Sequence, residues 1–395
     1  MKPLSRLLAS ALPVLALGLA TGAHAAGTLP PLPQQPPLPL PPSMLAPQIG
    51  DVRSAVLLDV NSDQVLLSQD GTARVPPSGL AKLMTALLLS QAERQGLLHP
   101  AQTVHVTDRA WRTPGSRMFL QPLKPVTVQQ LEDGLLIDGG NDAAVAIAQT
   151  VGGTVGAFVQ QMNADAAQLG LHDTHFVNPT GLPQPGQYSS ALDIAKLSRA
   201  LILSAPQVLT IAGRAGYTYD HIHQYNYNPL IGQGGVNGLA VGLYGKNLWN
   251  LAVSATRNGR TLVAVVMGAG SRSAAGSDAS ALLTYGWNGW KNEMLYGKQR
   301  VVAQLRNADW SPEHLDGITA AAVEVSVPVQ SGVQTQAHFI ATPHLAPPIR
   351  AGQPIGVMAI TWKGKALRSV PVFAGHAVQR ADWFEHLWHQ ARAAV

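Results

Sequence analysis

A hydroxyl and an amine at helical spacing are the first side chains in this sequence that could do chemistry. Ser78 and Lys82 lie four positions apart, at the start of a stretch whose leucines recur with the period of a helix. At about 100° per residue, the two positions lie about 40° apart around the helix, so the side chains could meet. A lysine amine can take the proton of a nearby hydroxyl and make its oxygen a nucleophile. The simpler interpretation is that Ser78, which follows two prolines, caps the helix.

A second polar run covers residues 138–142 and reads Asp-Gly-Gly-Asn-Asp. It lacks the alternating ligands of a calcium loop, so we expect no metal and no cofactor here. Asn141 is expected to cap the helix that follows. Asp138 or Asp142 is the predicted ion-pair partner of Lys82, because an unpaired buried ammonium is costly.

Periodic segments should position these side chains. Apolar residues at i, i+3, i+4, i+7 and i+8 from position 80 predict a helix, and a turn at 61–63 and an Asn-Gly pair at 258–259 predict two hairpins. Further helices are expected at residues 129–137, 142–151, 156–169 and 191–203, and strands at 55–59, 64–68, 248–256 and 261–268. From about residue 297 the sequence is rich in strand-forming residues, and strands are expected at 322–329, 334–341, 354–362 and 366–372.

The N-terminal residues favour export. Lys2 and Arg6 precede an apolar run that ends in a small-residue cleavage pattern, which is typical of a signal peptide over residues 1–26. Residues 27–48 are a proline-rich linker. Without Lys2 and Arg6, the 27 Lys and Arg become 25 against 22 Asp and Glu, a balance that gives no reason to expect nucleic-acid binding. The chain has no cysteine, which excludes disulfides and thiolate chemistry.

Several longer stretches resemble one family, the serine-type D-alanyl-D-alanine carboxypeptidases, or low-molecular-weight penicillin-binding proteins. They occur in order between residue 51 and the C-terminus: 116–120 (SRMFL), 140–143 (GNDA), 174–182 (THFVNPTGL), 187–193 (QYSSALD), 255–259 (ATRNG) and 265–268 (VVMG). The resemblance implies an α/β penicillin-binding domain at 49–296, a small all-β domain at 297–376 and a C-terminal amphipathic anchor helix at 377–395.

The resemblance also implies three catalytic motifs, and each has lost side chains here. Gly79 stands where the family has its nucleophilic serine, three residues before the retained Lys82. Gly139 stands where the serine of Ser-x-Asn belongs, whereas Asn141 is retained. In place of Lys-Thr-Gly the chain has Ala240-Val241-Gly242, which offers neither a cation nor a hydroxyl for a substrate carboxylate.

The last residues predict contact with a membrane surface. Trp383, Phe384, Leu387 and Trp388 fall on one face of a helix, which resembles the family's peripheral anchor on the outer face of the inner membrane. The alternative is a helix that packs on the β-rich domain.

The preferred interpretation is an exported, periplasmic pseudoenzyme that binds peptidoglycan stem peptides or regulates a wall-synthesis protein. One alternative is an active D,D-carboxypeptidase that uses Ser78 as a displaced nucleophile. Another is a periplasmic scaffold that recruits partners through its β-rich domain and linker.

Overall fold

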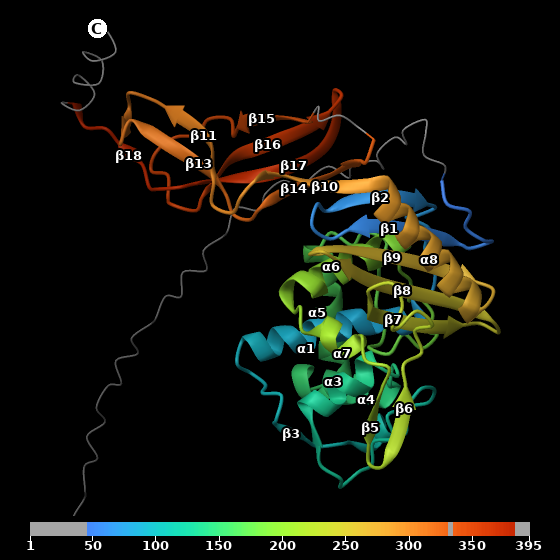
Figure 1. Cartoon of the computed structure of the whole chain (residues 1–395). Helices are drawn as coiled ribbons and strands as arrows, with labels where there is room; N and C mark the ends of the chain where they lie inside the picture. Colours follow the sequence, from blue (N-terminus) through green and yellow to red (C-terminus); the bar gives the residue numbers. More distant parts are fainter. Residues whose placement is uncertain (1–45, 331–334, 384–395) are drawn as a thin grey trace, which may run out of the picture. The chain divides into compact units, whose positions relative to one another are not determined.

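The first part of the chain folds around a five-stranded antiparallel sheet with helices on both faces (Figure 1). The computed structural model describes residues 46–330 and 335–383. The strand order is β2–β1–β9–β8–β7, so the two ends of the domain's sequence meet in one sheet. The bounds are β1 (Ser54–Asp59), β2 (Gln64–Gln69), β7 (Val236–Tyr244), β8 (Leu248–Arg257) and β9 (Arg260–Ala269).

The strands bury both faces of this sheet because alternate residues are apolar on each side. On β1, Val56 and Leu58 enter one hydrophobic cluster, while Ala55 and Leu57 enter another. The first cluster is shared with a group of helices, and the second with α8 (Arg272–Gly289). The helical group comprises η1 (Ser78–Ala81), α1 (Lys82–Arg94), α2 (Asp108–Trp111), α3 (Val128–Leu136), α4 (Asn141–Gly152), α5 (Val155–Gln168), α6 (Ala191–Ser204) and α7 (Val208–Ala212).

The predicted hairpins and helices are present with small shifts of their ends. At the β8–β9 turn, Asn258 and Gly259 have φ of 50° and 78°, as a tight Asn-Gly hairpin requires. Helix α8 was not predicted, because its many Ala, Gly and Ser residues carry little apolar periodicity. Ser271 caps this helix by accepting a hydrogen bond from Ala274 N at 3.0 Å. Two short ribbons complete this part: β3 (Thr103–Val104) with β4 (Val126–Thr127), and β5 (Gly216–Tyr219) with β6 (Ile222–Tyr225).

The C-terminal part is all β, as predicted. A second five-stranded sheet has the order β11–β13–β17–β16–β15. Its strands are β11 (Val301–Arg306), β13 (His314–Thr319), β15 (Thr335–Ala341), β16 (Pro354–Trp362) and β17 (Lys365–Ala374). Two further pairs are β10 (Trp290–Tyr296) with β14 (Val323–Pro328), and β12 (Trp310–Ser311) with β18 (Gln379–Arg380).

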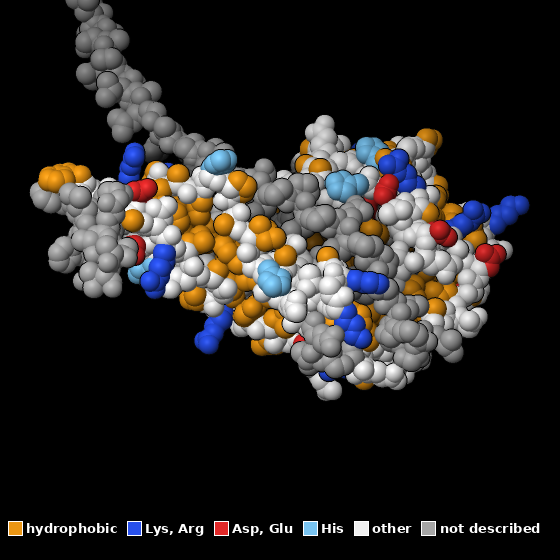
Figure 2. Space-filling view, turned by 90° about the horizontal axis from the view of Figure 1, so that it is seen from above, with side chains coloured by type: hydrophobic (Ala, Val, Ile, Leu, Met, Phe, Trp, Pro, Cys, Tyr) orange, Lys and Arg blue, Asp and Glu red, His pale blue; other side chains and the backbone are white. Residues whose placement is uncertain are grey.

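In the second sheet, side chains of the edge strand β15 alternate between the core and the surface. Along β15, Ala337 and Phe339 pack against the core, whereas His338 and Ile340 are exposed. Figure 2, seen from above the view of Figure 1, shows hydrophobic side chains exposed among polar ones over the left-hand part of this face.

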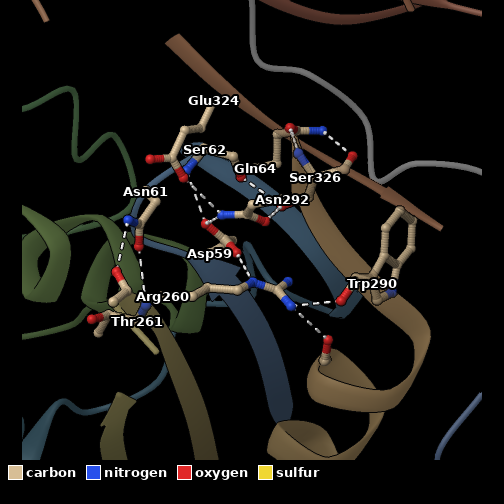
Figure 3. Close-up of polar contacts among 12 residues, drawn as sticks. Asp59, Asn61, Ser62, Gln64, Arg260, Thr261, Trp290, Asn292, Glu324 and Ser326 are labelled. Atoms are coloured by element: carbon tan, nitrogen blue, oxygen red, sulfur yellow. Dashed lines mark hydrogen bonds and ion pairs between the residues drawn. The ribbon is translucent and has the colours of Figure 1, made fainter. Parts of the chain in front are cut away.

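A buried polar network ties the β10–β14 ribbon to the first sheet (Figure 3). Its centre is Asp59 at the end of β1, which is fully buried and accepts hydrogen bonds from Arg260 at 2.6 Å and from Asn292 at 3.1 Å. Arg260 also donates to the carbonyl oxygens of Gly286 and Trp290, at the end of α8. Because almost every member has a partner, the network specifies how these elements meet.

Within the described residues, no single helix is long and apolar enough to cross a membrane; α4 and α5 meet that criterion only together, across a bend of 85°. The predicted signal peptide lies outside the described residues, as do most of the linker and Phe384, Leu387 and Trp388 of the predicted anchor helix.

Candidate active site

The turn before α1 carries the two residues at the expected nucleophile position. Ser78 begins η1 with φ of 53°, a left-handed backbone that serine rarely adopts. Its Oγ donates to Leu243 O on β7 at 3.1 Å and accepts from Gly79 N at 2.6 Å. The prediction that Ser78 caps the helix is wrong, since no side chain caps η1 or α1 and this hydroxyl joins the turn to β7 instead.

Gly79 lies against the backbone of β7. A Cβ atom built at this position would overlap the carbonyl oxygen of Val241 and lie 3.0 Å from Gly242 Cα. The contact is reciprocal, because a Cβ at Gly242 would overlap Ser78 Oγ and Gly79 N. Two glycines facing each other therefore let the turn and the strand approach more closely than any side chain would allow.

Lys82 is buried in the first turn of α1, with 6% of its surface exposed. Its Nζ donates to Thr180 O at 2.8 Å, and burial lowers the pKa of the amine from 10.5 to about 8. The predicted ion pair is wrong, because Asp138 and Asp142 act on Lys82 only through longer-range attraction. Their carboxylates bond elsewhere, to Tyr217 OH and to the backbone N–H groups of Met118 and Leu120, respectively.

The loop opposite Lys82 is held by two amide side chains, those of Asn178 and Gln187. Asn178 Oδ1 accepts from the backbone N–H of Thr180 at 3.2 Å and of Gly181 at 2.8 Å. Gly181, with φ of 81°, packs so closely on the Ser78 carbonyl that a Cβ could not fit. This loop belongs to the 174–182 stretch that carried the family resemblance, but the contact between Thr180 and Lys82 was not predicted.

The 138–142 segment lines the other side of the site. Asp138 accepts from Tyr217 OH at 2.9 Å, and burial raises the pKa of its carboxyl group to about 7. Gly139 has φ of 69°, with open space around its Cβ direction. Asn141 is the first residue of α4 and does not cap it; Gly140 is the N-cap, and Asn141 Nδ2 donates to Pro114 O at 2.7 Å.

The three segments meet around one cavity of about 350 Å³, as the motif positions require. Ala240, Val241 and Gly242 line it from β7, and most of the wall is apolar, including Leu135 and Trp249. Its polar groups include Ser78, Lys82, Ser116, Asp138, Asn141 and Thr180. Sequence reasoning missed Tyr217 and Trp249, since nothing in their local sequence marks them.

Comparison with known proteins places this arrangement in a family. The family model described as D-alanyl-D-alanine carboxypeptidase matches residues 43–271, more than half of the chain. The chain therefore belongs to the D-alanyl-D-alanine carboxypeptidase family, which confirms the resemblance inferred from the sequence.

Individual relatives cover almost the same extent. The chain is 31% identical to the D-alanyl-D-alanine carboxypeptidase DacA of Escherichia coli over 349 residues, covering 86% of each protein. It is 30% identical to DacC of the same organism over 360 residues, covering 87% of this chain and 88% of the relative.

Solved structures confirm the fold of both parts. Penicillin binding protein 5 from Haemophilus influenzae aligns with a TM-score of 0.77 at 28% identity, over 85% of this chain and 100% of that one. Penicillin binding protein 6B from Escherichia coli aligns with a TM-score of 0.68 at 30% identity, over 85% and 99%.

Proposed function

We propose that this protein is a non-catalytic member of its family, which binds peptidoglycan stem peptides at the cell envelope or regulates an active wall enzyme. The observation that carries the proposal is the contact of Gly79 with Val241 and Gly242, where the family resemblance places the nucleophile. A side chain is missing there, and the space that it would need is taken up by the backbone of β7.

The remaining groups support binding more than acyl transfer. An acyl-enzyme mechanism needs a nucleophile, a base, donors for the oxyanion and a cation for the substrate carboxylate. Lys82 is partly neutral near pH 8 and could act as a base, but its Nζ faces the Thr180 carbonyl. Ala240 and Val241 offer no charge or hydroxyl to a terminal carboxylate. What persists is a cavity of about 350 Å³, large enough for the end of a peptide.

The proposed setting is the outer face of the inner membrane. Export follows from the predicted signal peptide, and peripheral attachment from Trp383, Phe384, Leu387 and Trp388. Attachment of this kind would hold the cavity near newly made stem peptides.

Binding to cell-wall material tests the proposal directly. The purified mature protein should co-sediment with peptidoglycan sacculi and bind a synthetic stem pentapeptide without releasing D-alanine. Ala240→Phe should weaken peptide binding about tenfold because the ring would fill the cavity, whereas Ala101→Phe at an exposed loop should leave it unchanged. The proposal loses its support if the protein binds neither sacculi nor any wall enzyme in a pull-down.

One observation favours the alternative of a displaced nucleophile. Ser78 lines the same cavity as Lys82 and has a left-handed backbone, and such strain often accompanies reactive residues. Against this role, its Oγ is held by Leu243 O and Gly79 N. If D-alanine release is measurable, the alternative requires that Ser78→Ala abolish it.

A further inference from the structure

A second hollow of about 360 Å³ lies beside the candidate active site. It is lined by Trp111, Arg117, Phe119, Leu120, Gln121 and Pro122. Trp111 is 39% exposed and Phe119 is 47% exposed, which is unusual for two large aromatic rings around one hollow. Exposed apolar side chains that gather in one place on a protein surface mark interaction or ligand-binding sites more often than singly scattered ones do.

The backbone that carries Phe119 is held rigidly. The buried carboxylate of Asp142, at the start of α4, accepts from Met118 N at 2.9 Å and from Leu120 N at 3.0 Å. The side chains of Met118 and Leu120 are buried, so the residue between them must point outward. Phe119 does so with φ of 68°, a left-handed backbone conformation that is unfavourable for an aromatic residue. The ring is thus presented to solvent by a fixed frame.

The polar groups of the hollow suit a ligand with an apolar face and a polar rim. Within the described residues, the Arg117 side chain makes no hydrogen bond or ion pair, so its donors are available to a ligand. Gln121 donates to Asp220 at 3.3 Å, which leaves its carbonyl oxygen as an acceptor. Sugar rings have C–H faces that stack on aromatic rings and hydroxyl rims that bond to such groups.

The hollow and the cavity described above are lined by neighbouring residues of one segment. Ser116 lines the cavity, Arg117 and Phe119 line the hollow, and Asn141 N holds the segment by donating to Ser116 O at 2.8 Å. Because Ser116 and Arg117 are consecutive, a ligand that crosses this segment could reach both spaces.

We propose that the hollow at Trp111 and Phe119 binds the sugar rings of a peptidoglycan glycan strand while the attached stem peptide enters the cavity. This inference rests on the proposed function and adds a saccharide subsite to it. Trp111 and Phe119 stack on the rings, and Arg117 donates to their oxygens.

Titration of the full chain with peptide-free glycan strands and with chitotetraose tests the subsite. Phe119→Gly should weaken binding about tenfold without loss of folding, because glycine tolerates the left-handed backbone. Trp111→Ala should have a similar effect, and Phe119→Tyr, which keeps a ring, should bind like the wild type. Tyr225→Ala, at a ring that is 73% exposed on β6, is the matched control and should change nothing.

The saccharide subsite and the proposed function of the cavity can be disproved independently. If the wild type binds no glycan strand, or if Phe119→Gly and Trp111→Ala bind as it does, the saccharide subsite is wrong. A sugar-free stem pentapeptide is titrated in parallel. If the wild type does not bind this peptide but binds glycan strands, and Phe119→Gly and Trp111→Ala weaken the glycan binding, the proposed function of the cavity is wrong and the subsite is supported.

Discussion

Gly79 faces the carbonyl oxygen of Val241 across the boundary between the η1 turn and β7, with no room for a Cβ atom between them. Loss of the serine side chain without any other change would leave an empty space of the size of that side chain. Here the two backbones have closed on each other, and Ser78 Oγ joins them through Leu243 O. Restoring the missing serine therefore requires the strand or the turn to move.

Gly79→Ser should lower the free energy of unfolding by about 1–3 kcal/mol, the usual cost of overpacking a closed contact. The variant should not gain penicillin-binding activity, since Ala240 and Val241 still lack the cation and hydroxyl of the family motif. Urea unfolding measures the first effect. Gly156→Ser is the control, because the nearest atom to its Cβ direction is 4.0 Å away, and its stability should change by less than about 0.5 kcal/mol. A Gly79→Ser variant as stable as the wild type would contradict the closed contact.

The network in Figure 3 makes a separate prediction about stability. Arg260→Met leaves the fully buried Asp59 without its cation, which should cost about 3–5 kcal/mol. The double variant Asp59→Asn/Arg260→Met should recover part of this loss, because the uncompensated charge is removed. The comparison is Arg112→Ala, which breaks a pair with Asp108 whose two side chains are 70% and 71% exposed; it should change stability by less than about 0.5 kcal/mol. If Arg260→Met costs no more than Arg112→Ala, the network does not anchor the ribbon.

A buried carboxyl group on α3 gives a pH-dependent prediction. Burial raises the pKa of Glu132 from 4.5 to about 7, and its Oε1 has no hydrogen-bond partner. Between these pH values the folded state binds more protons at Glu132 than the unfolded state does. The contribution of Glu132 to stability is therefore fully present below pH 4.5 and is lost as the pH rises through 7.

Glu132→Gln does not titrate, so its stability relative to the wild type should increase with pH. We expect a relative gain on the order of 2 kcal/mol at pH 8 compared with pH 4.5, measured by urea unfolding of both proteins at each pH. A constant difference between Glu132→Gln and the wild type would mean that the Glu132 pKa is not raised.

The sequence predicted the fold well where patterns are local. The Asn258-Gly259 turn and the leucine period of α1 are set by neighbouring residues, and both appear as expected. Helix α8 was missed because its small residues pack against the sheet without a marked apolar face. Strand β10 lies before the domain boundary predicted after residue 296, yet it pairs with β14, which lies after that boundary. No local sequence pattern predicts this long-range pairing.

The sequence predicted which motif positions lie near one another, but it did not predict their hydrogen bonds. Family motifs placed Gly79, Lys82, Asn141 and Ala240 in one cavity, and the structure brings them together. The partner of Lys82 was predicted to be a carboxylate, on the argument that a buried ammonium needs an opposite charge. The carbonyl of Thr180 fulfils that need, because the Asn178 loop aims it at the amine and burial lowers the amine's pKa.

Incubation with a fluorescent penicillin followed by intact-mass measurement tests the central claim most directly. Penicillin binding protein 5 from Haemophilus influenzae, treated in parallel, serves as a positive control for the reagent. We expect the purified mature protein to keep its unmodified mass and to show no fluorescence. A stoichiometric adduct that maps to Ser78 and disappears in Ser78→Ala would contradict the account and make this protein an active enzyme with a displaced nucleophile.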